Sequence, residues 1–198
     1  MDLLALDVEY AHFQRADGSL LIKPAEVCVV DQHGQAVYRS FCHPGVKLSN
    51  GFKFRGGVQE ADWLEAPPLQ VVAADVRKCI AGKVLVGHGL NKDLAALRLS
   101  HPKRLQRDTI TYPPFRGPGG QAKRLRELAV ELLQREIQSG RHDAGEDAIA
   151  AMDLYLKYIH NAPEYMGYQD MVSHYLQQYL QPHQTATANG FRAVVDKR

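Results

Sequence analysis

Apolar and polar residues in the first part of the chain follow the pattern of β-strands. Residues 3–10 open with the continuously apolar run Leu3-Leu4-Ala5-Leu6, which predicts a buried strand. Residues 25–32 and 36–42 are predicted as two further strands, and His33-Gly34-Gln35 between them supplies a hairpin turn. Together these segments predict an antiparallel meander of three strands.

Helical spacing appears further along the chain. Residues 44–57 are loop-like, and Pro67-Pro68 then opens a helix to about Ile80, in which Leu69, Val72 and Val76 recur on one face. Beyond it we expect strands at 83–88 and 105–111 and helices at 90–99 and roughly 121–137, 144–160 and 164–180.

The order of these elements predicts an α/β fold. Strands come first, then a crossover helix, another strand and several helices, which indicates a mixed sheet with helices packed on it. The length of 198 residues fits one domain. We place that domain at residues 1–180 and a polar tail at 181–198. The Pro- and Gly-rich residues 113–120 are predicted to be flexible and to separate two halves of the domain.

Composition narrows the function classes only slightly. No apolar run approaches the roughly 20 residues that span a bilayer, so no membrane partner is expected. The opening residues carry an acid and too short an apolar stretch for a signal peptide, so an intracellular location is expected, nuclear or cytoplasmic. Three widely spaced cysteines without a CxxC pair favour reduced thiols over disulfides or a zinc site.

Charge leaves the question of nucleic-acid binding open. The net charge of +2 does not identify a nucleic-acid binder. Lys123, Arg124, Arg126 and Arg135 share one predicted helix and offer a face that can contact phosphates. A solvated helix surface, mixed with glutamates, explains the same residues.

Two carboxylates project to the same side of the first strand. Asp7 and Glu9 are two positions apart, near the carboxyl end of a buried segment, and side chains two apart on a strand share a face. The two carboxylates repel each other and lose hydration on burial. They therefore either bind a cation, or at least one of them retains a proton. A solvated strand end is the alternative.

Two further carboxylates lie on apolar helical stripes. Asp93 falls among Leu90, Leu94 and Leu97, where a charge needs a partner: a metal, a bound water or a hydrogen bond within the core. Asp93 can also serve as a helix-start acid that complements the dipole. Asp147 likewise shares its stripe with Ala151, Leu154 and Tyr158.

His142 precedes the predicted helix of Asp147. Asp143 is expected to cap this helix, with Glu146 three residues later in a variant capping box. On the loop, His142 can move as a base beside a fixed ligand. Hydrolysis of a phosphodiester needs cations that gather the attacking and leaving oxygens, and a group that takes a proton from water. Oxygen ligands favour Mg²⁺ or Mn²⁺ for the first task.

The motifs resemble those of the DEDDh group of 3′→5′ exonucleases, and among them the RNA exonuclease 4 and interferon-stimulated exonuclease branch. The resemblance covers residue 3 to about residue 158. It rests on Asp7-Val8-Glu9, on Gly87-His88-x-Leu90-x-x-Asp93-Leu94, on Arg107-Asp108-Thr109, and on His142-x-x-x-Glu146-Asp147-Ala148. It implies a ribonuclease-H-like, mixed five-stranded sheet, an antiparallel meander plus parallel strands, flanked by helices.

The resemblance also implies a division of labour. Asp7, Glu9, Asp93 and Asp147 would hold two divalent cations, Mg²⁺ or Mn²⁺, with Asp7 bridging both, and His142 would be the general base. Leu90 and the backbone near Tyr10 would steady the 3′-terminal nucleotide, Glu9 would contact its 3′-hydroxyl, and His142 would also lie at the substrate. His88 is expected to be a hydrogen-bonded core histidine and not a metal ligand.

Two departures from the branch concern the neighbours of these residues. Val8 and Tyr10 stand where the branch commonly has Cys and Met, and Tyr10 either borders the terminal base or belongs to the core. Asp143 stands where the branch often has a small hydroxyl residue. As an extra carboxylate beside His142, it is expected to shift the acidic limb of activity upward.

The sequence therefore predicts an exonuclease that hydrolyses single-stranded nucleic acid from the 3′ end to nucleoside 5′-monophosphates. RNA is the expected substrate. A DNA 3′→5′ exonuclease shares the same chemistry, and an inactive nuclease scaffold that binds nucleic acid is the alternative from another class. Partners among proteins are not indicated by the sequence.

Overall fold

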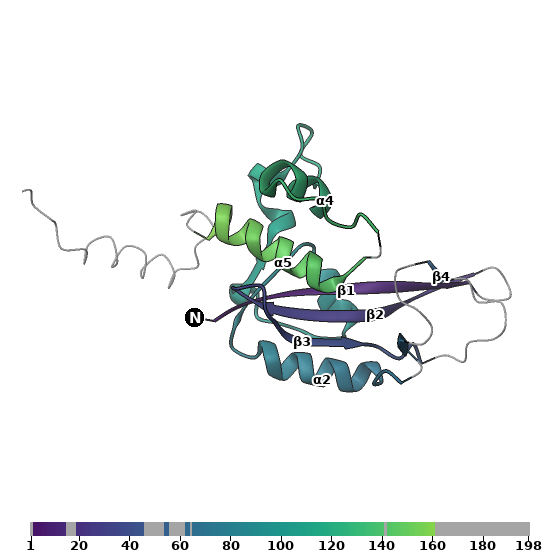
Figure 1. Ribbon diagram of the computed structural model, residues 1–198. Helices are drawn as coiled ribbons and strands as arrows, with labels where there is room; N and C mark the ends of the chain where they lie inside the picture. Colours follow the sequence, from purple (N-terminus) through teal and green to yellow (C-terminus); the bar gives the residue numbers. More distant parts are fainter. Residues whose placement is uncertain are drawn as a thin grey trace, which may run out of the picture. The chain divides into compact units, whose positions relative to one another are not determined.

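The centre of the fold is β1, Leu3–Gln14, in a mixed sheet (Figure 1). The computed structural model describes residues 2–14, 19–45, 54–55, 62–63, 65–140 and 142–160. Within this part of the chain, the strand order is β3-β2-β1-β5-β6, and the two-residue β4 also pairs with β1. The other strands are β2 Leu20–Asp31, β3 Ala36–Phe41, β4 Phe54–Arg55, β5 Val84–Gly87 and β6 Gln106–Asp108.

The sheet combines the two predicted kinds of pairing. β1, β2 and β3 pair antiparallel and form the meander, while β5 and β6 run parallel to β1 on its other side. These strands confirm the predicted mixed five-stranded sheet, to which β4 adds a short further strand. The long β1 extends beyond β5, because their pairing ends at Ala5 and Val86.

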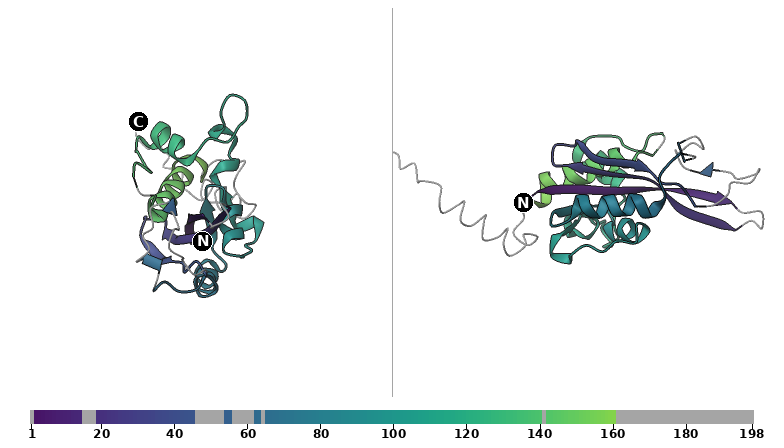
Figure 2. Two further views of the ribbon diagram at one scale, coloured as in Figure 1. Left: turned by 90° about the vertical axis from the view of Figure 1, so that its right-hand side faces the viewer. Right: turned by 90° about the horizontal axis from the view of Figure 1, so that it is seen from below.

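Helices cover both faces of this sheet (Figures 1 and 2). α2, Leu69–Ile80, lies against one face, and α5, Ala144–Leu154, packs against β1 and β2 on the other. α5 continues through a wider π-helical turn, Tyr155–Ile159. The remaining helical segments are α3 Leu90–Ala96, α4 Leu125–Leu128 with a π-helical turn Ala129–Leu133, and short 3₁₀ turns at Lys103–Leu105, Thr109–Thr111 and Pro113–Phe115.

Several predicted boundaries were wrong. α3 ends at Ala96, not Leu99, and the predicted strand 105–111 is a strand only over Gln106–Asp108. The predicted helix 121–137 is helical over 125–133. The predicted helix 164–180, the end of the domain at 180 and the tail 181–198 lie outside the described residues.

The segment predicted as flexible is anchored at Phe115. Pro113–Phe115 forms a 3₁₀ turn, and Phe115 is buried in edge-to-face contact with Tyr112 and Tyr158. The ring contacts tie this Pro- and Gly-rich stretch to the helical layer. The glycine and proline content predicts turns in this segment, and the contacts of the Phe115 ring fix its position on the fold.

Alternation along β1 separates the core from the acidic residues. Leu4, Leu6 and Val8 belong to a buried cluster with residues of α2 and α3. Asp7 and Glu9, which have the opposite parity, therefore face α5. Because the pairing of β1 with β5 ends at Ala5 and Val86, both acids lie just beyond the carboxyl end of this parallel pairing, the usual side for ligand binding in such sheets. Among the described residues, no helix is long and apolar enough to cross a membrane.

Candidate active site

Asp7 lies at the electrostatic centre of the site. Loss of hydration raises its pKa well above the ordinary value, and the carboxylates of Asp93, Asp147, Glu9 and Glu26 raise it further. For Glu9, burial together with Asp147 raises the pKa to about 7, although His142 opposes the shift. Both shifts favour the protonated carboxyls, and a bound cation would favour the charged forms instead.

Asp93 reaches the site from the first turn of α3. It is only 6% exposed. Burial raises its pKa to about 7, although backbone amides, including that of Val8, lower it in part. Val8 lies beyond the last pair of β1 and β5, Ala5 and Val86, so β5 does not compete with Asp93 for its amide. The leucine stripe thus predicted the burial of this acid correctly.

The start of α3 is fixed by Asp108. Its carboxylate accepts the backbone N–H groups of Gly89 at 2.7 Å and Leu90 at 2.9 Å. Gly89 has a φ of 88°, in the left-handed region that favours glycine. The Arg107-Asp108-Thr109 signature therefore includes a residue that caps the helix carrying Asp93, a role that sequence spacing did not reveal.

Asp147 comes from the first turn of α5. The N-cap of this helix is Asp143, as predicted, and its carboxylate accepts from Gly145 and Glu146. The reciprocal half of the capping box is absent, since the Glu146 carboxylate accepts the backbone N–H of Gln138 instead. Asp147 is 5% exposed, and burial raises its pKa.

His142 lies next to these acids on the loop before α5. Its Nδ1 is 3.7 Å from Oε1 of Glu9, and half of its side chain is exposed. Ligand atoms of Glu9, His142 and Asp147 lie within 4.8 Å of one another, so these three residues can hold a metal ion. His142 is thus exposed on a loop beside the acids, and its role as a movable base stays a prediction.

The donor set fits a cation. Oδ2 of Asp147 is hydrogen-bonded to Gln138, but the buried Oδ1 has no partner among the described residues. An unpaired buried acceptor costs free energy, and a divalent ion would satisfy it. Oxygen donors from Asp7, Glu9, Asp93 and Asp147 suit a hard cation such as Mg²⁺ or Mn²⁺.

An ion-pair network that the sequence did not predict lies behind the site. Arg39 on β3 contacts Oε1 of Glu26 through Nη2 at 2.7 Å, and Oδ2 of Asp143 at the same distance. Glu26 is buried and is the cross-strand partner of Glu9. A glutamate inside the apolar run Ala25–Val30 was the available signal.

The network changes the role predicted for Asp143. Burial alone would raise the pKa of this carboxyl, but hydrogen bonds from Arg39 and from backbone amides lower it. The Asp143 carboxylate pairs with Arg39 and accepts backbone N–H groups at the start of α5. The carboxylate that lies beside His142 is instead that of Glu9. The expected influence of Asp143 on the base thus lacks a supporting contact.

The side chains of Leu90 and Tyr10 both pack in the core of the fold. The Leu90 side chain is fully buried in the core cluster, so it offers no surface to a ligand. Tyr10 packs against the same cluster, and its hydroxyl donates to the carbonyl of Lys92. Its ring thus lies on the opposite face of β1 from Glu9. The burial of the Leu90 side chain and the packing of Tyr10 are thus structural, and the predicted contacts of Leu90 and of the backbone near Tyr10 with a nucleotide stay predictions.

His88 is the core histidine that the sequence predicted. Its Nδ1 lies 2.8 Å from the hydroxyl of Thr109, and its Nε2 donates to the carbonyl of Lys123 at 3.1 Å. Burial lowers its pKa, which keeps the ring neutral. Both ring nitrogens are occupied, so His88 links the end of β5 to the segment before α4.

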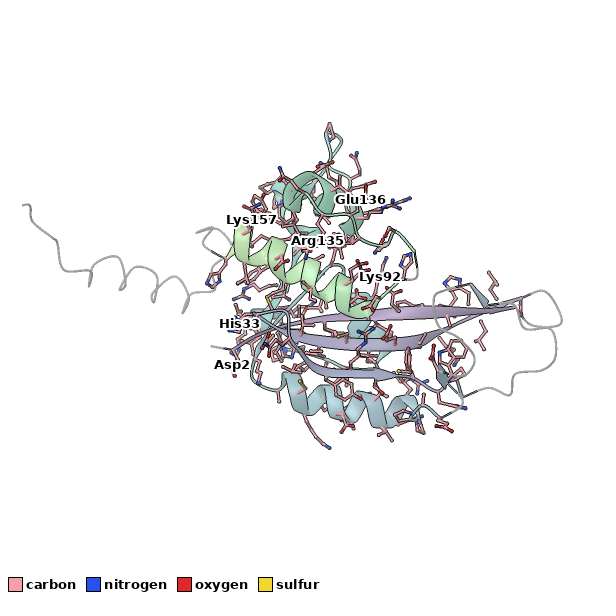
Figure 3. All side chains as sticks on the ribbon, in the orientation of Figure 1. Asp2, His33, Lys92, Arg135, Glu136 and Lys157 are labelled. Atoms are coloured by element: carbon pink, nitrogen blue, oxygen red, sulfur yellow. The ribbon has the colours of Figure 1, made fainter. Side chains whose placement is uncertain are left out.

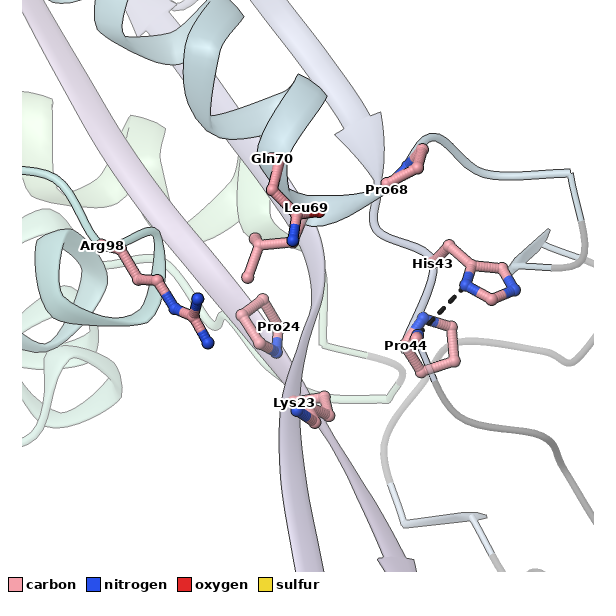
Figure 4. Close-up of a pocket in the computed structure, with 9 residues that line it drawn as sticks. Lys23, Pro24, His43, Pro44, Pro68, Leu69, Gln70 and Arg98 are labelled. Carbon is pink, nitrogen blue, oxygen red and sulfur yellow. Dashed lines mark hydrogen bonds between the residues drawn. The ribbon is translucent and has the colours of Figure 1, made fainter.

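The cavities in the described part of the chain include two that are bordered by basic side chains. One, of about 210 Å³, is bordered by Lys23, His43 and Arg98 and contains no acid (Figure 4). The other, of about 610 Å³, lies between β2, β3 and the start of α5, and Arg39, Arg135 and Asp143 line it. Arg135 itself lies beside α5 (Figure 3) and pairs with Asp153. Neither cavity is lined by the four candidate metal ligands.

This arrangement defines a class of protein. A mixed sheet with a long central strand presents Asp7 and Glu9, and two helices add Asp93 and Asp147 beside a loop histidine. These are the fold and the acidic residues of a ribonuclease-H-like exonuclease.

Comparison with known proteins agrees with this class. RNA exonuclease 4 of Aspergillus fumigatus is 41% identical over 132 residues, which cover 66% of this chain and 43% of the relative. Human apoptosis-enhancing nuclease is 34% identical over 137 residues, covering 66% and 42%. The chain thus spans about two fifths of the length of these curated relatives. No protein-family model matches it.

A solved structure shows the same fold. The pseudoubiquitin hydrolase–RNA exonuclease module of Saccharomyces cerevisiae Pan2, in complex with AAUUAA RNA, is similar with a TM-score of 0.67 and 25% identity, covering 90% of this chain and 32% of that one. The chain belongs to the DEDDh exonuclease family. Its relatives include the RNA exonuclease 4 proteins.

Proposed function

We propose that this chain is a 3′→5′ exonuclease that trims single-stranded RNA to nucleoside 5′-monophosphates with two divalent cations, Mg²⁺ or Mn²⁺. The observation that carries the proposal is that four acids, Asp7, Glu9, Asp93 and Asp147, lie close enough to influence one another's pKa, with the exposed His142 beside Glu9. Burial raises the pKa of each of these four carboxyls, which is the electrostatic condition of a site that binds cations.

The four carboxylates would divide the cations between them. Bound cations would supply stabilisation of the charge that develops on the attacking and leaving oxygens of the phosphodiester. Asp7, whose pKa is raised by burial and then by the surrounding acids, is the best placed to be shared by both ions. Glu9 and Asp147 lie on its α5 side, and Asp93 comes from α3.

His142 is the candidate general base. It lies on the loop immediately before the helix of Asp147, and its Nδ1 faces Glu9 across 3.7 Å. A neutral imidazole can accept a proton from the attacking water. Glu9, which contacts the ring, keeps that ring beside the carboxylates.

RNA as the substrate is supported by the relatives. The curated relatives include proteins named RNA exonuclease 4, and the Pan2 module is described in complex with RNA. The proposed partner is therefore the 3′ end of a single-stranded RNA. A recognition module on an inactive scaffold would not require all four acids and the histidine to converge.

The test is a trimming assay with the full chain. A 5′-labelled single-stranded RNA is incubated with Mg²⁺ or Mn²⁺, and we expect a ladder that shortens from the 3′ end together with nucleoside 5′-monophosphates. Asp7→Asn should abolish the ladder. Asp75→Asn on α2, which removes an acid paired with Lys78, is the matched control and should leave trimming intact.

Two results would contradict the proposal. One is the absence of trimming by the native chain with either metal, which is the behaviour of an inactive scaffold. The other is persistent trimming by Asp7→Asn. A matched DNA oligonucleotide run beside the RNA separates an exoribonuclease from a DNA exonuclease, because only the sugar differs.

A further inference from the structure

The side chain of Gln138 contacts the Asp147 carboxylate directly. We propose that Gln138 is a positioning residue of the metal site, whose amide holds Oδ2 of Asp147 so that Oδ1 is presented to the cation. This inference rests on the proposed function and deepens it, because it assigns a residue that none of the sequence motifs includes.

The two oxygens of Asp147 have different surroundings. Oδ2 accepts from Nε2 of Gln138 at 2.5 Å. Oδ1 is buried and has no partner among the described residues. A ligand carboxylate that is oriented by a hydrogen bond on one oxygen is common at metal sites, and such outer partners tune metal affinity. The bare oxygen is thus the one that the cation would take.

A neutral donor suits this task. Where an arginine or lysine holds a buried carboxylate, its positive charge competes with a cation for the negative charge. The Gln138 amide fixes the direction of the Asp147 carboxylate but leaves its charge available. The pKa of Asp147 is still raised, because burial outweighs the hydrogen bond from Gln138.

The backbone of Gln138 is fixed independently of its side chain. Its N–H donates to Oε2 of Glu146 at 2.8 Å, and its φ is 57°, in the left-handed region that non-glycine residues rarely adopt. The preceding Ile137 is fully buried. A residue held in this conformation by its neighbours is a candidate for a functional constraint.

Gln138 also anchors the loop that carries the base. Ser139 and Gly140, which follow it, are exposed and border the 610 Å³ cavity. The bonds from Gln138 to Glu146 and Asp147 therefore attach the loop to α5 four residues before His142. Gln138 thereby holds both the metal ligand Asp147 and the start of the loop that leads to His142.

The experiment is a calorimetric titration of the full chain with Mn²⁺. Gln138→Met keeps the length of the side chain but cannot donate a hydrogen bond. Gln138→Gly removes the amide while favouring the left-handed backbone. The matched control is Gln134→Gly, since Gln134 also has a left-handed φ of 54° and is exposed.

We expect both Gln138 variants to bind Mn²⁺ about 10- to 100-fold more weakly than the native chain, the usual cost of losing an outer partner. Gln134→Gly should bind as the native chain does. In the trimming assay, excess Mn²⁺ should restore activity to Gln138→Met, because the amide acts through the affinity for the metal. A defect in folding would not be restored by added metal.

Affinity of Gln138→Met within about twofold of the native value would overturn the inference, since the expected loss is at least tenfold. Absence of Mn²⁺ binding by the native chain would overturn it too. If native Mn²⁺ binding depends on Gln138 but no RNA is trimmed, the proposed function fails and the positioning role stands.

Discussion

Asp108 at the end of β6 caps the helix that begins at Leu90. Oδ2 of Asp108 accepts the backbone N–H of Leu90 at 2.9 Å, and Oδ1 accepts that of Gly89. The acid comes from a neighbouring strand and not from the residue before the helix. Through this contact, the sheet fixes the turn that carries Asp93.

The first prediction concerns this cap. Asp108→Ala should destabilise the protein by about 1 kcal/mol, the usual effect of removing a helix cap. For a chain of this size, that corresponds to a fall in Tm of roughly 2–4 °C. Thermal denaturation followed by circular dichroism measures the change. Asp108→Asn, which retains one acceptor oxygen, should lose less, and an equal loss in both variants would contradict capping through two oxygens.

The second prediction concerns pH and metal. Burial raises the pKa of Glu9 and of Asp93 to about 7 in the folded chain, above their unfolded values. Groups shifted in this direction stabilise the fold fully below their unfolded pKa, and that contribution is lost as pH rises through the folded pKa. The metal-free chain should therefore lose stability from these groups between about pH 4.5 and pH 7 or above.

Thermal denaturation in a chelator, at pH 5 and pH 8, measures this loss. Mn²⁺ should raise Tm strongly at pH 8 and weakly at pH 5, where protons compete for the carboxylates. Asp7→Asn should raise the Tm of the metal-free chain at pH 8, because it relieves repulsion among the acids, and should remove most of the response to Mn²⁺. A metal-induced shift equal at both pH values would contradict the prediction.

The third prediction contrasts the two partners of Arg39. Glu26 is 3% exposed at its side chain, whereas Asp143 is 41% exposed. Arg39→Met leaves the buried Glu26 unpaired beside Glu9, so we expect the free energy of unfolding to fall by about 1–3 kcal/mol, the usual cost of an unsatisfied buried group. Asp143→Asn keeps an N-cap and breaks only the exposed pair, so its cost should be about 1 kcal/mol or less.

Urea denaturation of both variants measures these costs. Glu26→Gln combined with Arg39→Met should recover part of the stability, since the unpaired buried charge is then removed. Equal losses of unfolding free energy in Arg39→Met and Asp143→Asn would show that the pair of Arg39 with the buried Glu26 contributes no more than the exposed pair with Asp143.

The fourth prediction separates the two histidines of the motifs. His142 is half exposed and contacts Glu9, whereas His88 is partly buried with both ring nitrogens hydrogen-bonded. His142→Ala should lower kcat for trimming by about 10²- to 10⁴-fold, the range for general bases, with little change in Tm. His88→Leu should lower Tm, because it leaves the Lys123 carbonyl without its donor.

Activity and Tm measured on both variants test this separation. A large fall in Tm for His142→Ala would identify a structural role for that ring. Unchanged stability of His88→Leu would contradict the core role of His88.

Local periodicity predicted most of the fold correctly. The apolar runs at residues 3–10 and 83–88 became β1 and β5, and the stripe from Leu69 to Ile80 became α2. Boundaries were less well predicted where a contact distant in sequence ends an element. β6 gives way to a 3₁₀ turn after Asp108, whose carboxylate accepts the N–H of Ile110 as well as those of α3.

The sequence by itself determined which residues carry charge into the interior. Asp93 and Asp147 lie on apolar stripes, and alternation puts Asp7 and Glu9 on one strand face, because periodicity reports the burial of a position from its neighbours. Spacing also separated His142 from the rigid acids.

Only the tertiary structure decided which groups surround these residues. It brought Gln138 to Asp147, Asp108 to the start of α3, and Arg39 to Glu26 and Asp143. It also buried Leu90 and turned Tyr10 away from Glu9. The physical reason is that a hydrogen bond or ion pair between distant segments depends on how the sheet and helices pack, and no local pattern records that partner.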